Sequence, residues 1–349
     1  MAQINKPNEY FNTKLYTGNG STQSITGVGF QPDLVWTKGR SGATNHYQTD
    51  AVRGATKTLR SNQTQAETTQ TGGLTAFGSD GFSIGSDGAI NANSETFASW
   101  NWLADNTSGS SNTDGSITST VSANTIAGFS ICTYTGNGGN PSNFGHGLGV
   151  APSMVLIKNR DYSGDPTGFL VYHKSNGANY SLTLHTTNAK SSNTISFGNT
   201  TPSSSVVYVG DNGGNYGTNL NTHTYVAYCF AEKKGFSKFG SYIGNGNADG
   251  SFIYLGFKPA FLIVKRTDTA NFWLIRDNKR DTFNVSNKTL NADGADTEAS
   301  WGSTYLIDYL SNGFKCRDAT TPINASGGTY IYMAFAEEPL VGDNPATAR

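Results

Sequence analysis

The acidic residues that could act in catalysis occur singly along the sequence. Asp105, Glu232 and Glu337 each follow an apolar, strand-like segment at the same position. A glycosidase needs two carboxyl groups about 5–10 Å apart, one of them with a raised pKa. One acid that recurs without a recurring partner is better explained as a solvated strand end. The sequence therefore predicts a protein that is not an enzyme.

Metal and cofactor sites are not expected either. The five histidines are scattered, no pair has the spacing of metal ligands, and no Gly-x-Ser-x-Gly or Walker-type segment occurs. Residues 78–81 and 85–88 both read Gly-Ser-Asp-Gly, which could offer oxygen ligands to calcium. Two turns on either side of the strand expected at 82–84 explain these segments better.

Recurring basic residues and one tryptophan are the candidates for binding a partner. The basic residues could hold an acidic partner, or they could protect strand edges from pairing. Trp36, Trp100 and Trp102 lie in segments expected in the core, so Trp301 is the better candidate for a surface aromatic. The basic candidates are Lys38 and Arg40, Lys158 and Arg160, and Lys265 and Arg266.

The composition predicts an all-β protein. Of 349 residues, 42 are glycine, 12% are aromatic and only 14% are charged. Many aromatics exclude a disordered chain, and many turn formers favour short strands joined by tight turns. A formal charge of −1 gives no electrostatic reason to expect nucleic acid or membrane binding, and no apolar run is long enough for a membrane span. The three cysteines lie in apolar segments and are expected as buried free thiols.

A threefold internal repeat determines the predicted organisation. The segment Tyr-x-Gly-Asn-Gly occurs at 16–20, 134–138 and 242–246, and an apolar run that starts after a proline and ends in lysine follows each copy. The copies end alike, at 100–105, 227–232 and 332–337, after a hydrophobe-Asn-small triplet at 90–92, 220–222 and 323–325. We predict module 1 at 1–105, a Ser/Thr/Asn/Gly-rich linker at 106–125, module 2 at 126–232, a short linker at 233–235 and module 3 at 236–349.

Each module is predicted to be an antiparallel β-sandwich of jelly-roll or lectin-like kind. The Asn-Gly pairs supply the positive φ angles of tight turns, and no segment has a sustained helical period. The closing strands carry apolar residues at all alternate positions, with Leu103, Phe230 and Phe335 expected on one face. These strands should therefore be buried on both faces. The long linker suggests that module 1 is freer than the other two.

The sequence resembles a family of modules found in tailed phages, especially marine ones, known as tail-fibre or virion structural proteins. The segments that carry the resemblance are 145–152, 225–232, 236–242, 323–330 and 334–337. The resemblance covers nearly the whole chain and implies a structural or adhesive part of a virion. It supplies no catalytic or binding residues. An N-terminal anchoring domain, collagen-like repeats and a coiled-coil shaft, which long tail fibres have, are not recognisable here.

The predicted function is that of a bacteriophage virion surface protein, either a tail fibre or short appendage or a head decoration protein. It would assemble in the host cytoplasm and contact other virion proteins and copies of itself. A homotrimer is expected from the resemblance and from the apolar residues on both faces of the closing strands. The alternative is an adhesin for a host glycan or surface protein, and a glycan-cleaving tailspike-type enzyme ranks third.

Overall fold

The computed structural model describes residues 4–162, 168–211, 217–300, 302–339 and 345. Strands make up 44% and helices 3% of the structure, so the predicted all-β class is confirmed. Within these residues the paired strands are antiparallel, and one isolated bridge, between Ile117 and Phe144, is parallel. The three cysteines are free and buried, as expected.

Module 1 consists of two facing sheets, with short strands and helical turns beside them. The larger sheet has the order β1 (Phe11–Thr17), β9 (Thr96–Trp102), β3 (Leu34–Gly39), β4 (Tyr47–Asp50). The smaller sheet has the order β2 (Gln23–Thr26), β8 (Gly81–Ile84), β7 (Leu74–Gly78). The remaining elements are η1 (Pro7–Glu9), β5 (Lys57–Thr58), β6 (Thr68–Thr69) and α1 (Gly88–Asn91).

Module 2 repeats this plan with a longer first sheet. Its central strands keep the order seen in module 1, as β12, β19, β14 and β15. The whole sheet runs β10 (Ser110–Asn112), β11 (Ser119–Asn124), β12 (Phe129–Thr135), β19 (Thr224–Phe230), β14 (Met154–Asn159), β15 (Leu170–His173), β16 (Tyr180–Thr183), β17 (Ser191–Ser192). The smaller sheet pairs β13 (Ser142–Gly145) with β18 (Val206–Val209).

Module 3 has the same order again. Its larger sheet runs β20 (Ser237–Ile243), β28 (Thr329–Pro339), β22 (Phe257–Arg266), β23 (Trp273–Asp277), β24 (Lys288–Asn291), β25 (Ala299–Ser300). The smaller sheet runs β21 (Phe252–Tyr254), β27 (Gly313–Cys316), β26 (Ile307–Leu310), and α2 (Thr321–Asn324) precedes β28. One chain therefore contains the same four-strand order three times.

The segment predicted as a linker is structured over much of its length. Residues 110–112 and 119–124 form β10 and β11, and β11 pairs with β12, whose counterparts β1 and β20 are edge strands in modules 1 and 3. The expectation failed because a strand added at a sheet edge is held by backbone hydrogen bonds, which polar side chains do not prevent. Two apolar side chains in the segment, Ile117 and Val121, are also buried in module 2.

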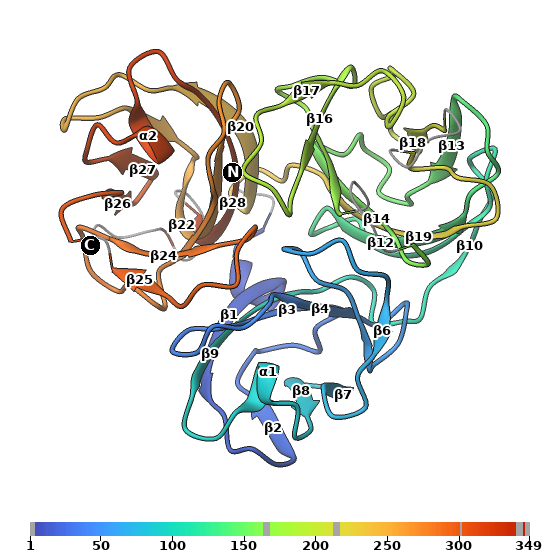
Figure 1. The fold of residues 1–349 in the computed structure, drawn as a ribbon, viewed down its shortest axis with the longest axis horizontal. Coiled ribbons are helices and arrows are strands. Elements are labelled where there is room, and N and C mark those ends of the chain that lie inside the picture. The colour runs from blue at the N-terminus through green and yellow to red at the C-terminus, as the bar shows by residue number, and fades with distance from the viewer. Residues whose placement is uncertain (1–3, 163–167, 212–216, 301, 340–344, 346–349) are drawn as a thin grey trace.

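The three modules surround a common central core (Figure 1). Their larger sheets face one another, and their smaller sheets lie on the outside. Trp102, Phe230 and Phe335 occupy equivalent positions on the three closing strands, and their ring centroids lie 5.8 to 6.2 Å apart. These rings mark an approximate threefold axis within a single chain. Module 1 is therefore packed against both other modules and is not freer than they are.

The closing strands are buried on both faces, as the sequence predicted. Phe230 of β19 faces the central core, whereas the adjacent Cys229 faces the separate core between the two sheets of module 2. In module 1 the predicted register is wrong by one residue, because Trp102 and not Leu103 enters the central core. The second apolar face is covered by the other modules of the same chain, so it no longer indicates a homotrimer. That expectation then depends on the resemblance alone.

Candidate functional site at the module junctions

Each Tyr-x-Gly-Asn-Gly segment is hydrogen-bonded to the residues that precede the closing strand of its module. In each copy the tyrosine hydroxyl donates to the carbonyl that precedes a buried asparagine, and this asparagine accepts a hydrogen bond from the motif's own asparagine N–H. In module 2 the buried residue is Asn219, so the triplet predicted at 220–222 is out of register by two residues. The tyrosine hydroxyls donate from Tyr16 to Ile90 (2.8 Å), from Tyr134 to Thr218 (2.6 Å) and from Tyr242 to Ile323 (2.7 Å). The asparagine N–H groups donate from Asn19 to Asn91 (2.9 Å), from Asn137 to Asn219 (3.0 Å) and from Asn245 to Asn324 (3.0 Å).

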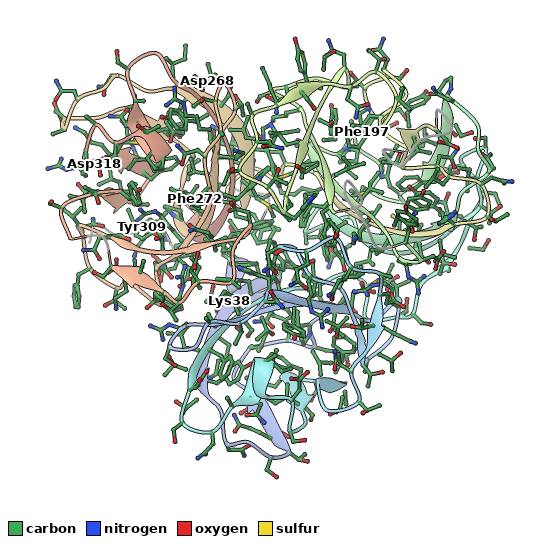
Figure 2. The ribbon with its side chains drawn as sticks, viewed as in Figure 1. Lys38, Phe197, Asp268, Phe272, Tyr309 and Asp318 are labelled. Carbon is green, nitrogen blue, oxygen red and sulfur yellow. The ribbon has the colours of Figure 1, made fainter. Side chains whose placement is uncertain are left out.

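The recurring lysines are buried and bind the neighbouring module. Lys38 of module 1 donates to the carbonyl oxygen of Asp296 in module 3, at 2.7 Å (Figure 2). Lys158 of module 2 donates to the carbonyl of Thr64 in module 1, at 2.8 Å, and Lys265 of module 3 to the carbonyl of Thr187 in module 2, at 2.9 Å. The three contacts therefore run in one direction around the threefold axis.

Burial changes the acidity of these lysines. It lowers the pKa of Lys38 and of Lys265 to about 8 and that of Lys158 to about 7. All three ammonium groups are fully enclosed by the protein. They are therefore groups that join modules, and the hypothesis that they hold an external acidic partner does not fit their position.

Two of the three junctions add an arginine–glutamate pair. Arg160 of module 2 forms two hydrogen bonds with Glu67 of module 1, at 2.9 and 3.0 Å. Arg40 of module 1 pairs in the same way with Glu298 of module 3, at 3.1 and 2.9 Å. Planar two-point pairs of this kind fix geometry as well as contributing energy.

The third junction lacks this pair because both partners differ. Strand pairing places Thr267 where Arg40 and Arg160 lie, since all three N–H groups bind the first residue of the closing strand. Lys190 occupies the glutamate position, and its N–H donates to the Thr267 carbonyl at 3.0 Å. Arg266, which the sequence grouped with the other arginines, pairs with Asp268 of its own module at 2.8 Å.

A buried aspartate–arginine pair lies next to each Arg–Glu pair. Arg53 donates to Asp50 at 2.5 Å and to Glu67 at 3.0 Å, and the side chains of Arg53 and Asp50 are wholly inaccessible. The hydroxyl of Tyr228, in module 2, donates to Asp50 at 2.8 Å. The two arginines and the two carboxylates of this cluster balance in charge, which offsets the cost of removing them from water.

The junction of modules 1 and 3 repeats this arrangement. Arg280 donates to Asp277 at 2.5 Å and to Glu298 at 3.1 Å, and the indole of Trp100 takes the place of the tyrosine. Burial opposes ionisation of Glu298, but its bonds with Arg40 and Arg280 hold the pKa of this carboxyl below its usual value. Both charged clusters are thus closed, and neither offers an unpaired group to a ligand.

His46 joins modules 1 and 3 as a neutral imidazole. Its Nδ1 accepts a hydrogen bond of 2.8 Å from the indole of Trp36, so its Nε2 carries the proton and donates to the Asn291 carbonyl at 2.9 Å. Burial keeps its pKa well below the usual value. Trp36 therefore lies in the core, as expected from the sequence.

The remaining candidates from the sequence are placed as follows. Trp301 lies outside the described residues. Glu232 pairs with Lys174 at 2.7 Å and Glu337 with Lys258 at 3.0 Å, while Asp105 accepts hydrogen bonds from Ser122 and Thr107. The two aspartates considered for calcium accept from backbone instead, Asp80 from Gly27 and Gly29, and Asp87 from Ala89 at the start of α1.

Two open grooves lie at equivalent junction positions. One, with a volume of about 630 Å³, lies between the β22–β23 connection, the start of α2 and Thr187 of module 2. The other, of about 480 Å³, lies between the β3–β4 connection, α1 and Ala295 of module 3. Since Ala295 and Thr187 belong to the loops that the junction lysines hold, the threefold repeat relates the two grooves.

Neither metal sites nor long apolar helices are found in the parts of the chain that the structure describes. No three His, Cys, Asp or Glu side chains gather there in a way that could hold a metal ion. Among the same residues, no helix has the length and apolar character to cross a membrane.

The whole of this architecture falls within one family model. A model described as "Domain of unknown function (DUF7483)" matches residues 6–339. The chain belongs to this family. No curated protein matches the chain, and no solved structure matches it. Because the DUF7483 match begins before β1 and ends with β28, it covers all three modules together with their junctions.

The sequence reasoning missed the charged clusters, although this DUF7483 chain contains a signal for them. Asp50-Ala-Val-Arg53 and Asp277-Asn-Lys-Arg280 have the same Asp-x-x-Arg spacing, which starts at the last residue of the equivalent strands β4 and β23. Module 2 has His173-Lys-Ser-Asn at this position. An alignment of the segments that form β4, β15 and β23 would have shown two Asp-x-x-Arg pairs and, in module 2, a histidine in place of the aspartate.

Proposed function

We propose that this protein is a non-catalytic structural component of a bacteriophage virion surface. The resemblance of segments 225–232 and 323–330 to virion proteins provides the phage assignment. The observation that carries a structural role is the common core, in which aromatic residues of all three modules meet at Trp102, Phe230 and Phe335. A chain that uses buried lysine, arginine and aspartate side chains to join its modules, and holds three modules as one body, fits a rigid building block.

The threefold arrangement within one chain supports a particular mode of assembly. A single copy presents three similar outer sheets to its surroundings, as a trimer of smaller subunits would. Such a unit could occupy a position of local threefold symmetry on a particle, or be added in series to a short appendage. In either case other virion proteins are its partners, and assembly takes place in the host cytoplasm.

Imaging of purified particles tests this function. A phage that encodes the chain is labelled with a gold-conjugated antibody against it and examined by electron microscopy. We expect label on every intact particle, at the head or at the tail. Particles that carry none, while the soluble protein accumulates in the lysate, would overturn the proposal.

A further inference from the structure

The groove between modules 2 and 3 has the chemistry of a site for an uncharged, amphipathic ligand. Of the described residues that line it, none carries a charge. One wall is the ring of Phe272, which is 37% exposed. The rest of the lining is rich in hydroxyl and amide groups, from Asn271, Thr187, Thr304, Thr320 and Thr321. The volume of about 630 Å³ lies within the range of about 300–1,000 Å³ typical of small-ligand sites.

The exposed ring is held in place from both modules. The N–H of Asn271 donates to the Thr187 carbonyl at 2.7 Å, and the Asn271 carbonyl accepts from Lys265 at 2.6 Å. The side-chain oxygen of Asn271 then accepts the N–H of Phe272 at 3.0 Å. Figure 2 shows Phe272 on the side of module 3 that is nearest to module 2. A large apolar ring kept at the surface by its backbone contacts is preorganised to meet a ligand.

Other parts of the lining are also fixed. The backbone of Tyr305 has a φ angle of 58°, a conformation that residues other than glycine rarely adopt. The Tyr305 carbonyl accepts a hydrogen bond from the buried Arg276. Thr320 directs its hydroxyl hydrogen to Asp318, which leaves the oxygen able to accept. The groove therefore combines one apolar face with an edge of polar groups in fixed positions.

A pyranose ring matches this combination. One face of a hexose presents C–H groups, which are attracted to the negative face of an aromatic ring, and its rim presents hydroxyl groups that donate and accept hydrogen bonds. A ligand with a carboxylate, sulfate or phosphate would find no cationic side chain among the lining residues. A peptide bound in extended form needs the backbone of an open strand edge, and the described lining consists of loops and a helix start.

The equivalent groove of module 1 lacks these features. The pair Thr37 and Tyr47 corresponds to Val264 and Leu274, so Asn45 stands where Phe272 stands in module 3. The ring of Tyr47 is covered by the guanidinium of Arg60, at 5.1 Å, and Glu95 contributes a carboxylate to the lining. The groove between modules 2 and 3 therefore has an exposed aromatic ring and an uncharged lining, and the groove of module 1 has neither.

We propose that the groove formed by Asn271, Phe272, Thr304, Thr320 and Thr187 binds a neutral saccharide, with Phe272 stacked on a pyranose face. The proposal does not depend on the virion assignment. It would give the structural protein a means of attachment to a glycan surface. Failure of particle labelling would leave it standing, and its own failure would leave the structural role standing.

The test is direct binding to the full chain. Neutral trisaccharides of glucose, galactose and N-acetylglucosamine, with a sialylated trisaccharide as anionic probe, are titrated to about 10 mM and followed by saturation-transfer NMR and calorimetry. We expect saturable binding of at least one neutral trisaccharide. Phe272→Ala should weaken it at least tenfold, about 1.4 kcal/mol, and Phe272→Tyr should retain it.

The matched control is Phe283→Ala, because Phe283 is 80% exposed and is not among the groove residues. This variant should bind as the unchanged protein does. The proposal is wrong if no neutral trisaccharide binds, if the sialylated probe binds more tightly, or if Phe283→Ala and Phe272→Ala weaken binding equally. Circular dichroism of each variant confirms that the fold is retained.

Discussion

The indole nitrogen of Trp100 donates a hydrogen bond of 3.0 Å to a carboxylate oxygen of Asp277, which lies in another module 177 residues away. At the next junction the hydroxyl of Tyr228 makes the same bond to Asp50, at 2.8 Å. At the third junction the donor position holds Met333, which has no hydrogen to donate, and the carboxylate position holds the neutral His173. The third junction thus replaces both the donor and the carboxylate, because a buried carboxylate without its hydrogen-bond partner would be costly.

The buried arginines should therefore be more important than any surface charge. Arg280→Met leaves Asp277 buried without its cation, and we expect a loss of about 3–5 kcal/mol in the free energy of unfolding. Chemical denaturation at neutral pH measures it. The control is Lys6→Ala, since the Lys6–Glu9 pair is 60% and 53% exposed and should contribute below about 1 kcal/mol. Similar losses in the two variants would contradict the assignment of a closed charged cluster.

The common core predicts that the three modules unfold as one unit. Trp102, Phe230 and Phe335 are each buried against the other modules, so loss of one module exposes apolar surface on the remaining two. We expect a single calorimetric transition with a ratio of calorimetric to van't Hoff enthalpy near one. Separate transitions, or a ratio near three, would show that the modules are independent.

The first glycine of each Tyr-x-Gly-Asn-Gly segment should tolerate no side chain. A Cβ on Gly18 would lie 2.2 Å from the carbonyl oxygen of Ala92, and Gly136 and Gly244 have the same close approach, at 2.2 and 2.3 Å. Gly18→Ala should reduce the free energy of unfolding by about 1–3 kcal/mol, because the backbone must shift. In Gly88→Ala the nearest atom is 4.0 Å away in the first turn of α1, so this variant should be neutral or more stable. Thermal unfolding of the two variants distinguishes a clash from a general loss of flexibility.

The sequence was informative about elements and less so about register. Repeated turn glycines and apolar runs predicted the strands and the doubly buried closing strands, because burial leaves a direct trace in residue type. The register of module 1 was wrong because Leu103 is an extra residue before Ala104, which a gap-free comparison of 100–105 with 227–232 cannot show. The strands at 110–112 and 119–124 were missed because strands that extend a sheet beyond its repeated part need few apolar residues.

The candidate site was harder to predict for a physical reason. Lys38, Lys158 and Lys265 were found from their recurrence, but a lysine at a strand end is equally consistent with solvent exposure and with contact to another module. Only the arrangement of the modules decides between the two, and it depends on contacts far apart in the sequence. Phe272 had no repeat partner, so the comparison of repeats did not mark it out.

His173, at the junction between modules 2 and 3, should make the protein less stable in acid. Burial lowers the pKa of His173 to about 4, from about 6.5 in the unfolded chain, so the unfolded chain binds more protons between these values. The stability that depends on the neutral ring is complete above about pH 6.5 and falls as the pH decreases toward 4. Relative to His173→Gln, the unchanged protein should lose about 1–2 kcal/mol between pH 7.5 and 5. Urea denaturation of both proteins at the two pH values measures this, and equal losses would mean that folding does not lower the pKa of His173.

The third junction also allows the missing ion pair to be installed. Thr267→Arg alone places a cation near Lys190, and Lys190→Glu alone removes the ammonium that lies 4.8 Å from the Tyr180 ring, so each single change should destabilise the protein. Together they recreate the pair that Arg40 and Glu298 form at the equivalent position, at 2.9 Å. We expect a favourable coupling energy of at least about 0.5 kcal/mol in a double-mutant cycle. Strictly additive effects would show that the backbone of this junction has diverged too far for the two side chains to meet.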